Sequence, residues 1–341
     1  MRVLLIGPLP PPHGGISVHV SGIHRHLLAA GVTCRVLDMS VTRPGFGFVW
    51  TALRYALQGW TLHLHTNGHN LKSWLVALGC GLAGQFRGGC MLTLHSGIVP
   101  KYLGNAQPWR KRLAAFTCSL YRQIVCVSPE IRDALLLIGV EPQRMEVLPA
   151  FLSTDRFNVS HEPELLAWIG RSRPLLSTVL FFRPEYGFDL LIDCLALLRH
   201  SCPSFGCMVM GSGEQRIEAE QRVREAGLEE SVLLLGDVCH ETCLSLVSAC
   251  DMFLRTTLTD GDSISVREAH AMGIPVVATN VGMRPAGAIL FDAGDVEGML
   301  AAIERALAVT RGSQPHAAGS MDRLMEIYRR VDGSEGSMCL N

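Results

Sequence analysis

The sequence predicts an α/β fold in which two doubly wound domains face each other. Short apolar runs alternate with segments of helical periodicity along most of the chain. This rhythm stops once, at the polar and proline-containing stretch Pro149–Arg173, and then starts again. The 341 residues also suit two domains of roughly 150 residues each. Because strands that alternate with helices form parallel sheets covered on both faces, we expect a ligand cleft where the carboxyl ends of the strands meet.

The first half carries one complete series of elements, which we assign to a domain at residues 1–155. The expected strands are short and apolar: Arg2–Gly7, Thr33–Asp38, Trp60–His65, Cys90–His95, Gln123–Val127 and Met145–Leu148. The expected helices lie between them: one with Ile16, Val20, Ile23 and Leu27 at helical spacing that stops at Gly31, then Leu71–Ala83, one near Trp109–Leu120, and one from Ser128-Pro129 to Gly139.

The second half repeats this architecture at residues 170–315, after Pro149–Arg173 as the segment between domains. Its expected strands are Ser177–Phe182, Phe205–Met210, Val232–Leu235, Met252–Leu254, Pro275–Ala278 and Ala288–Phe291. Its expected helices are Asp189–Leu198, Glu214–Ala226, one from Asp262 to Gly273, and Asp295–Val309. Residues 316–341 add a last amphipathic helix, Met321–Arg330, with Leu324, Ile327 and Tyr328 on one face.

The composition narrows the class of protein. A formal net charge of -1 excludes a strongly basic nucleic-acid binder, so no nucleic-acid partner is expected. The 12 cysteines lie mostly in apolar runs, and no secretory leader is recognised, so we expect buried thiols in a reducing cytoplasm. No stretch reaches the roughly 18 uninterrupted apolar residues of a membrane span. The Cys239–Cys243 cluster lacks standard zinc spacing, so no metal is expected.

Paired glycines follow the first strand. Gly14 and Gly15 stand before a helix, after the proline-rich segment Pro8–Pro12. Glycine lets the backbone approach a ligand closely, and a helix N-terminus attracts a phosphate. The alternative interpretation is a plain turn between two elements, and the residues alone leave both open.

A pair of carboxylates marks the second half. Asp260 lies in a loop before a helix, and Glu268 lies about two turns inside it. Two such carboxylates could accept hydrogen bonds from a polyhydroxylated ligand, while the N–H groups of Ser263 and Ile264 at the helix start suit an anion. Two alternatives remain open: Ser265 and Glu268 as a capping box, and Asp260-Gly261-Asp262 as a metal pair or a turn.

Arg183 follows a strand and precedes Pro184-Glu185-Tyr186-Gly187. A lone arginine at such a position is most often a surface charge. It acquires a binding role only if it faces a phosphate, which a guanidinium binds in a bidentate manner.

Taken in order, these residues identify the chain as similar to the retaining glycosyltransferases of family 4, which have the GT-B fold of two facing Rossmann-like domains. The resemblance spans nearly the whole chain and is strongest at the acidic pair spaced by seven residues. The other matching segments are Pro10–Gly15, His95, Val127-Ser128, Val147–Pro149, Arg183, Gly187–Leu191, Met210–Glu214, Leu235-Gly236, Ala269 and Gly273–Ala278.

The resemblance implies a set of roles. Glu268 would hold the ribose of a UDP- or GDP-sugar, and Asp260 would contact the donor sugar with the N–H groups near Ser263 and Ile264. Arg183 would neutralise the diphosphate, with Gly14 and Gly15 lending N–H groups from the N-terminal, acceptor-side domain, and His95 would face the transferred sugar. The last helix would cross back to that domain. No cofactor and no metal would be needed, because protein charges stabilise the leaving group.

The resemblance also implies a glycan or lipid-linked acceptor, and a role in making cell-envelope polysaccharide, lipopolysaccharide or exopolysaccharide. A basic and aromatic stretch would then meet anionic lipids on the inner face of the membrane. It comprises Lys101, Tyr102, Trp109, Arg110, Lys111, Arg112, Tyr121 and Arg122. A solvated helix face is the commoner interpretation of such residues. Three interpretations of His63, His65 and His69 remain open: a metal cluster, strand-end groups near the acceptor, or a solvated loop.

Two departures from the family pattern matter. Asp260 replaces the usual Glu, and Tyr186 replaces an expected phosphate-binding Lys. Loss of that cation should weaken stabilisation of the leaving group, unless Arg267 or Arg216 compensates. A lysine at 186 is therefore expected to raise turnover, unless the loop is rebuilt around the tyrosine. Two other functions remain open: a nucleotide-sugar epimerase, and a noncatalytic partner in a glycan-assembly complex.

Overall fold

The computed structural model of the 341-residue chain describes residues 1–11, 14–42, 45–86, 89–149, 159–308 and 320–332. The chain divides into two compact units. The first comprises Met1–Leu152, Asp260–Asp262 and Ala317–Asn341, and the second comprises Ser153–Thr259 and Ser263–His316. The domain boundaries predicted at residues 155, 315 and 316 lie outside the described residues.

The first unit contains a six-stranded parallel sheet in the order β2-β1-β3-β4-β5-β6. Its strands are β1 (Arg2–Gly7), β2 (Thr33–Asp38), β3 (Thr61–Thr66), β4 (Cys90–Leu94), β5 (Gln123–Cys126) and β6 (Met145–Val147). Every residue of β3, β4 and β5 is buried. Burial on both faces explains why β4 and β5 are mostly apolar, whereas β3 alternates Leu62 and Leu64 with buried histidines and threonines.

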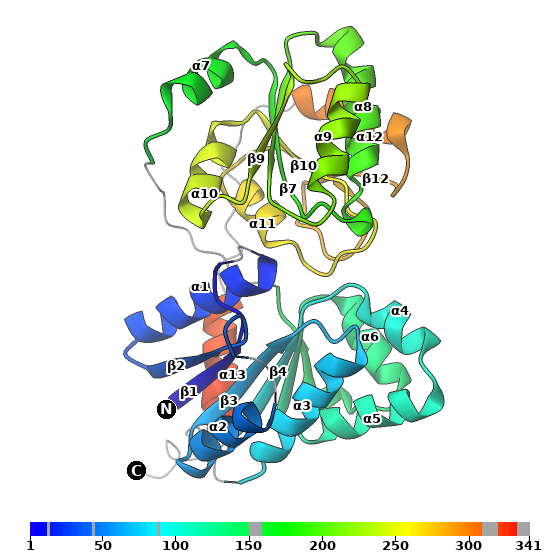
Figure 1. Cartoon of the computed structure of the whole chain (residues 1–341). Helices are drawn as coiled ribbons and strands as arrows, with labels where there is room; N and C mark the ends of the chain where they lie inside the picture. The colour runs from blue at the N-terminus through cyan, green and yellow to red at the C-terminus, as the bar shows by residue number, and fades with distance from the viewer. Residues whose placement is uncertain (12–13, 43–44, 87–88, 150–158, 309–319, 333–341) are drawn as a thin grey trace. The chain divides into compact units, whose positions relative to one another are not determined.

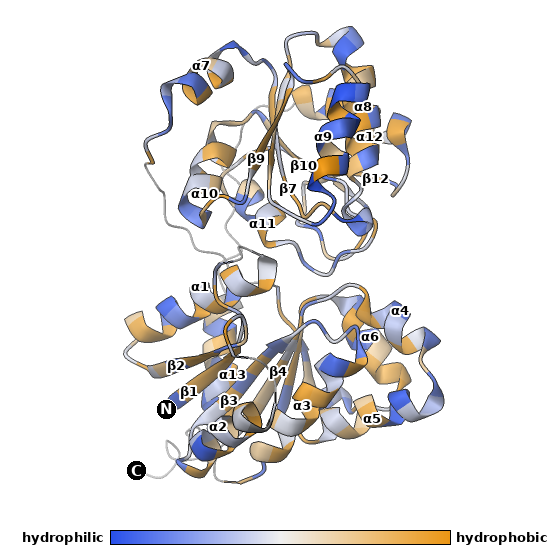
Figure 2. Ribbon diagram, viewed as in Figure 1, coloured by the Kyte–Doolittle hydropathy of each residue, from blue (hydrophilic) through white to orange (hydrophobic). Residues whose placement is uncertain are grey.

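Helices cover both faces of this sheet. They are α1 (Gly15–Ala29), α2 (Phe46–Leu57), α3 (Leu71–Ala83), α4 (Val99–Asn105), α5 (Pro108–Ser119) and α6 (Pro129–Leu137), with a 3₁₀ turn η1 (Pro142–Arg144). One core joins the sheet to α2–α6, and a separate core joins its other face to α1 and the last helix. In Figure 2, α3 is hydrophobic along most of its length, as expected for a helix buried in the first of these cores.

The last helix, α13 (Ser320–Asp332), packs on the first unit. Leu324, Ile327 and Tyr328 are at most 3% exposed and lie in the core that contains α1. Polar contacts support the packing, because Arg122 donates to the carbonyl of Val331 over 2.9 Å. The chain therefore returns to its first unit after completing the second, as the amphipathic pattern and the resemblance predict.

The second unit contains another six-stranded parallel sheet, in the order β12-β11-β10-β7-β8-β9. Its strands are β7 (Leu175–Val179), β8 (Gly206–Met210), β9 (Val232–Gly236), β10 (Met252–Arg255), β11 (Val276–Thr279) and β12 (Ile289–Phe291). Its helices are α7 (Pro163–Arg171), α8 (Phe188–Ser201), α9 (Arg216–Glu225), α10 (His240–Ala249), α11 (Ile264–Ala271) and α12 (Val296–Leu307), with a 3₁₀ turn η2 (Pro184–Tyr186). Figure 1 shows α8, α9 and α12 on one face of this sheet and α10 and α11 on the other.

Helices α2, α4 and α10 are not among the helices expected from the sequence, and two further details of the second unit also differ. Helix α7 lies inside the stretch assigned to the segment between domains, and its Leu165, Trp168 and Ile169 pack on the core of the second unit. Pro163 occupies the first turn of this helix, where proline is favoured rather than disruptive. Strand β7 also ends at Val179 instead of Phe182. The α/β class and the two parallel sheets are confirmed.

The eleven cysteines among the described residues are all free, and most are buried. Burial raises the pKa of the Cys34 and Cys80 thiols to about 12, so these groups stay protonated at neutral pH. Among the described helices, none combines the length and the apolar character that crossing a membrane would require.

Candidate functional site

In the second unit, two loops that follow the carboxyl ends of strands pack tightly against each other. The turn η2 follows β7, and the segment Thr256–Leu258 follows β10. The Thr256 hydroxyl donates to the carbonyl of Tyr186 over 2.8 Å, and the N–H of Leu258 donates to the carbonyl of Glu185 over 2.8 Å. Parallel α/β sheets bind ligands at this edge, so the loop geometry decides what can bind.

Gly187 makes this close approach of the two loops possible. It has φ 66° and ψ 40°, the left-handed conformation, and it is the residue at which η2 ends and α8 begins. A Cβ atom built on it would lie 2.2 Å from the carbonyl oxygen of Thr256. Any other residue would therefore push the two loops apart, which explains why the sequence has glycine directly after Tyr186.

Tyr186 is packed between an arginine and an aromatic ring. The guanidinium carbon of Arg255 lies 5.2 Å from the centre of the Tyr186 ring, and the Phe181 ring meets it edge-on at 5.7 Å. Arg255 is 8% exposed and donates to the carbonyl of Val179 over 2.8 Å. The loop that lacks the expected lysine thus packs against a different cation, which the sequence analysis did not identify.

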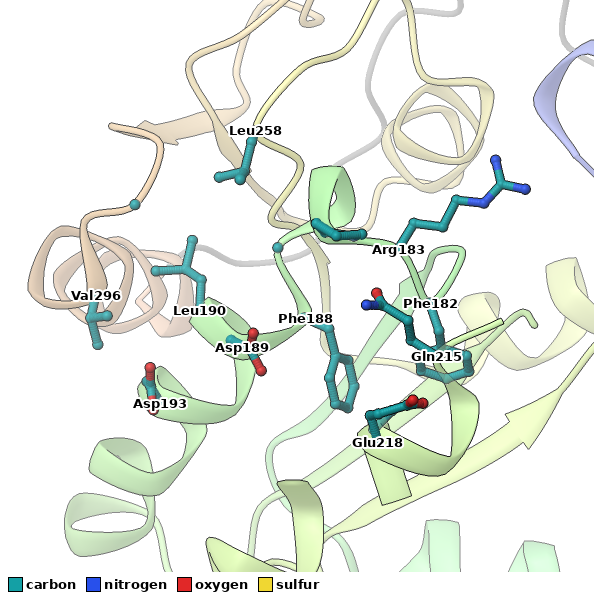
Figure 3. A pocket seen from close by; sticks show the side chains of 14 residues that line it. Phe182, Arg183, Phe188, Asp189, Leu190, Asp193, Gln215, Glu218, Leu258 and Val296 are labelled. Atoms are coloured by element: carbon teal, nitrogen blue, oxygen red, sulfur yellow. The ribbon is translucent and has the colours of Figure 1, made fainter. Parts of the chain in front are cut away.

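Arg183 precedes η2 and is exposed. Its guanidinium carbon lies 5.8 Å from the centre of the Phe181 ring. Arg183 borders a pocket of about 370 Å³ that is also lined by Asp189, Asp193 and Glu218, but Figure 3 shows its guanidinium extending away from Asp189 and Asp193. Asp189 and Asp193 form ion pairs with Arg222, and the acidic lining as a whole disfavours a diphosphate in that pocket.

Glu268 is held by a residue far away in the sequence. It lies on α11, is 6% exposed, and its Oε1 atom is 2.7 Å from Nε2 of His240 at the start of α10. This contact orients the carboxylate through its Oε1 atom. The capping-box alternative is wrong, because the residue that caps α11 is Ser263 and Ser265 lies inside the helix.

The start of α11 carries two more of the predicted residues. Ser263 and Ile264 are both buried, at 5% and 7% exposure. The first N–H groups of any α-helix have no acceptor within the helix, so this end can accept an anion. Asp260, by contrast, is grouped with the first unit, and its Oδ1 atom accepts a hydrogen bond from the N–H of Gly261 over 3.1 Å.

The proposed compensating cations differ in their surroundings. Arg216 forms an ion pair with Glu220 at 2.9 Å on α9, so its charge is already neutralised. Arg267 is 7% exposed on α11, and its Nη2 atom lies 2.8 Å from the sulfur of Met283. Arg284 donates to the carbonyl of Thr279, the last residue of β11. Arg255, Arg267 and Arg284 therefore give the strand-end region of this unit a cationic character.

The glycine loop of the first unit has one of its predicted donors occupied. The N–H of Gly14 donates to the Ser17 hydroxyl over 2.9 Å, and that hydroxyl donates back to the Gly14 carbonyl over 2.9 Å. A phosphate that binds Gly14 must replace the first of these bonds. Gly15, the first residue of α1, has open space where a side chain would lie.

His95 belongs to a buried group of histidines in the first unit. Its Nε2 atom lies 3.1 Å from Nδ1 of His65 at the end of β3, and its ring meets the His19 ring edge-on at 5.1 Å. Burial lowers the pKa of His95 and His65 well below the ordinary value, and neighbouring histidines lower them further. These imidazoles are therefore neutral at pH 7 and serve as hydrogen-bonding groups rather than as cations.

The histidines at the end of β3 are not solvated. His63 is 0% exposed, with Nδ1 at 2.5 Å from the Tyr328 hydroxyl and Nε2 at 2.7 Å from the Thr93 hydroxyl. His69 instead contacts the Ser96 hydroxyl at 2.9 Å. The interpretation of these residues as a solvated loop is wrong for His63 and His65, because strand β3 is central in its sheet.

The basic and aromatic stretch splits into an interior and a surface part. Tyr121 is 1% exposed and donates to the carbonyl of Ala77, and Arg122 anchors α13. Trp109 and Phe116 on α5 are 52% and 54% exposed, and the Arg110 guanidinium lies over the Trp109 ring. Helix α5 thus presents the exposed aromatic and basic surface of this stretch.

Two family models match the chain. The one described as Glycosyl transferases group 1 matches residues 173–308, in the second unit, and the one described as Glycosyltransferase Family 4 matches residues 44–156, mainly in the first. The two matches are consecutive and do not overlap. They follow the same division of the chain that the two sheets show.

Curated relatives include proteins named for lipid and lipopolysaccharide substrates. A phosphatidylinositol N-acetylglucosaminyltransferase subunit of Arabidopsis thaliana is 25% identical over 228 residues, which is 65% of this chain and 49% of that protein. The lipopolysaccharide core biosynthesis mannosyltransferase LpsB of Rhizobium meliloti is 32% identical over 161 residues, 45% of this chain and 42% of that protein. The chain thus spans about half the length, or less, of these relatives.

Solved structures confirm the GT-B fold. HepE of Anabaena, in complex with UDP and glucose, aligns with a TM-score of 0.72 at 15% identity, covering 99% of this chain and 100% of that one. Sucrose-phosphate synthase of Thermosynechococcus elongatus aligns with a TM-score of 0.70 at 18% identity, covering 99% and 98%. At such identities the likeness concerns the fold alone.

Proposed function

The chain belongs to family 4 of the glycosyltransferases, and we propose that it transfers a sugar from a nucleoside-diphosphate sugar to a glycan or lipid-linked acceptor. The observation that carries this proposal is the buried carboxylate of Glu268, held by His240 beside a helix start and within a cationic strand-end region. A carboxylate accepts from paired ribose hydroxyls, and guanidinium groups bind phosphates.

The donor is a UDP- or GDP-sugar in this proposal. Glu268 binds the ribose, the N–H groups near Ser263 and Ile264 donate to an oxygen of the donor, and Asp260 contacts the sugar. Arg183 binds the diphosphate together with Gly15, and with Gly14 once Ser17 is displaced. His95, neutral and partly exposed, faces the transferred sugar as a hydrogen-bonding group. The likeness to a HepE structure that contains UDP and glucose supports this class of donor.

Transfer proceeds with retention of anomeric configuration and without a metal in this proposal. Charge develops on the departing diphosphate, and fixed cations stabilise it without a bound ion. The second cation is Arg255 rather than a residue at position 186, because Arg255 packs on the Tyr186 ring in the loop that contains Arg183. No cofactor takes part.

The acceptor side is proposed from the relatives and from the surface of α5. Proteins named for phosphatidylinositol and lipopolysaccharide substrates are similar to this chain. The exposed Trp109 and Phe116 with nearby arginines suit contact with anionic lipid headgroups. We therefore place the protein in the cytoplasm, peripheral to the inner face of the membrane, and acting in cell-envelope or exopolysaccharide synthesis.

A panel of radiolabelled UDP- and GDP-sugars tests the activity. The purified chain is incubated with each donor and a lipid extract containing candidate acceptors, with and without EDTA. We expect label to move from one donor to an acceptor, equally in both conditions, with the donor's anomeric configuration kept in the product by NMR. An epimerised donor, or donor binding without turnover, would contradict the proposal, and a loss of transfer in EDTA restored by manganese would contradict its metal-free form.

A further inference from the structure

Three histidines from three different elements converge in the first unit. His19 on α1, His65 at the end of β3 and His95 after β4 each place a ring nitrogen within 4.8 Å of the other two. His19 and His65 are 5% and 1% exposed, and His95 is partly exposed. Among the described residues this is the only group of three or more metal-ligating side chains gathered so closely.

These imidazoles are in the form that binds metals. Burial lowers the pKa of His19 to about 4 and the pKa of His65 and His95 well below the ordinary value. A metal ion binds neutral imidazole, and it competes with the proton for the same nitrogen. At pH 7 no proton has to leave a charged ring before an ion can bind.

The His65 ring has a nitrogen that makes no hydrogen bond within the described part of the chain. The Nε2 atom of His65 is buried and makes none, while its Nδ1 atom lies 3.1 Å from Nε2 of His95. A buried polar atom without a hydrogen bond is costly, so few native structures leave one in that state. His63 stacks against the His65 ring with centres 4.1 Å apart, and is itself fixed by Thr93 and Tyr328. The His65 ring is therefore held in place, with its Nδ1 atom facing His95.

We propose that His19, His65 and His95 form a binding site for Zn²⁺, with water as the fourth ligand. Three neutral histidines and a water constitute an open zinc site, and a set without carboxylates disfavours Mg²⁺ and Ca²⁺. Zinc–nitrogen bonds of about 2.1 Å bring tetrahedral ligands to roughly 3.4 Å from one another. Nδ1 of His65 and Nε2 of His95 lie 3.1 Å apart, already near that distance, and a ring nitrogen of His19 lies within 4.8 Å of the ligand atoms of both.

The site has a consequence for activity that rests on the proposed function. If His95 faces the sugar in the metal-free enzyme, a bound zinc ion takes that imidazole away from the substrate. Zinc is therefore an inhibitor of transfer in this account, and a chelator protects the enzyme.

Direct metal binding tests the site without any sugar substrate. The full chain, without a polyhistidine tag, is titrated with Zn²⁺ by calorimetry and with Co²⁺ by visible absorption. We expect one ion per chain and the intense bands of four-coordinate Co²⁺, which Zn²⁺ abolishes. His65→Asn and His19→Asn should each weaken binding at least tenfold, whereas the matched control His69→Asn, a histidine that contacts Ser96 outside the group, should bind as the wild type does.

The proposal is overturned if the wild type binds no ion stoichiometrically, or if His65→Asn and His19→Asn bind as the wild type does. Circular dichroism checks that each variant is folded, and His95→Ala, at a partly exposed position, gives the same readout if the buried variants unfold. Inhibition is measured separately: one equivalent of Zn²⁺ should lower transfer and EDTA should restore it. Absence of transfer in the metal-free protein would refute the proposed function but not the site.

Discussion

Nε2 of His240 lies 2.7 Å from Oε1 of Glu268, although the two residues are 28 positions apart. His240 is the first residue of α10 and Glu268 lies on α11, and these two helices pack on the same face of the second sheet. Both side chains are largely buried. A carboxylate held in this way has its orientation set before a ligand arrives, which reduces the entropy lost on binding.

Loss of this contact should weaken nucleotide binding without removing the carboxylate. We expect His240→Leu to raise the Kd for the nucleotide about fivefold, since one hydrogen bond contributes about 1 kcal/mol. His240→Gln should recover most of the affinity, because its amide nitrogen reaches the same position as Nε2. Calorimetry with UDP and GDP measures both variants, and equal Kd values for Leu and wild type would show that His240 does not position Glu268.

A lysine at position 186 should lower turnover rather than raise it. The Tyr186 ring packs on Arg255 with 5.2 Å between the guanidinium carbon and the ring centre. Two positive charges about 5 Å apart repel by roughly 3 kcal/mol at an effective dielectric constant of 20. The packing thus favours the interpretation that the loop is rebuilt around Tyr186 over the interpretation that the phosphate site lacks a cation.

The Tyr186→Phe variant is the control for this change, since it keeps the ring that Arg255 contacts. We expect Tyr186→Phe to retain most of the activity and Tyr186→Lys to lose it while remaining folded. Higher turnover in Tyr186→Lys would contradict the account and restore the view that the phosphate site lacks a charge.

The C-terminal helix should contribute strongly to stability. Ile327 is 0% exposed between α13 and the first sheet, and truncation of a buried Ile to Ala costs about 2–5 kcal/mol. Urea denaturation should show this loss for Ile327→Ala, while Asp322→Ala on the exposed face should stay within about 0.5 kcal/mol of wild type. Similar midpoints for the two variants would mean that α13 does not stabilise the first unit.

Acid should destabilise the protein through its buried histidines. Burial lowers the pKa of His19 to about 4 and that of His63 to about 3, whereas both take their ordinary pKa of 6.5 when unfolded. Below pH 6.5 the unfolded chain binds protons that the folded chain does not, so stability falls as the pH falls towards 4 and is constant above 6.5.

The expected loss is about 2 kcal/mol per histidine at pH 5. Urea denaturation at pH 7.5 and pH 5 measures it, and His63→Gln should reduce the difference between the two pH values. A free energy of unfolding that does not change between these pH values would contradict the burial of neutral histidines.

Most of the fold could be predicted from the sequence because its signals are local. Leu71–Ala83 has the bounds of the predicted helix, and Arg2–Gly7 and Thr33–Asp38 have the bounds of the predicted strands. Helix α7 is not predicted because Pro163 and the polar residues before it resemble a linker, while its packing on the core of the second unit is a tertiary effect.

The site is predicted less completely because its key contacts join distant segments. Nothing near His240 or Arg255 in the sequence indicates that they contact Glu268 and Tyr186, since both contacts depend on how strands β10 and β7 and helices α10 and α11 meet. His19 likewise becomes informative only when β3 and β4 bring His65 and His95 beside α1. Its periodic placement on the buried face of α1 is the one available signal.

Glu268→Gln, measured by calorimetry with UDP and GDP, tests the central claim most directly. An amide accepts more weakly from two ribose hydroxyls than a carboxylate does, and a charged hydrogen bond contributes about 1.5–3 kcal/mol. We predict a Kd at least tenfold higher for the nucleotide that the wild type binds, with Glu229→Gln, an exposed carboxylate of the same unit, unchanged. An unaltered Kd in a folded Glu268→Gln protein would contradict the assignment of this carboxylate to the donor nucleotide.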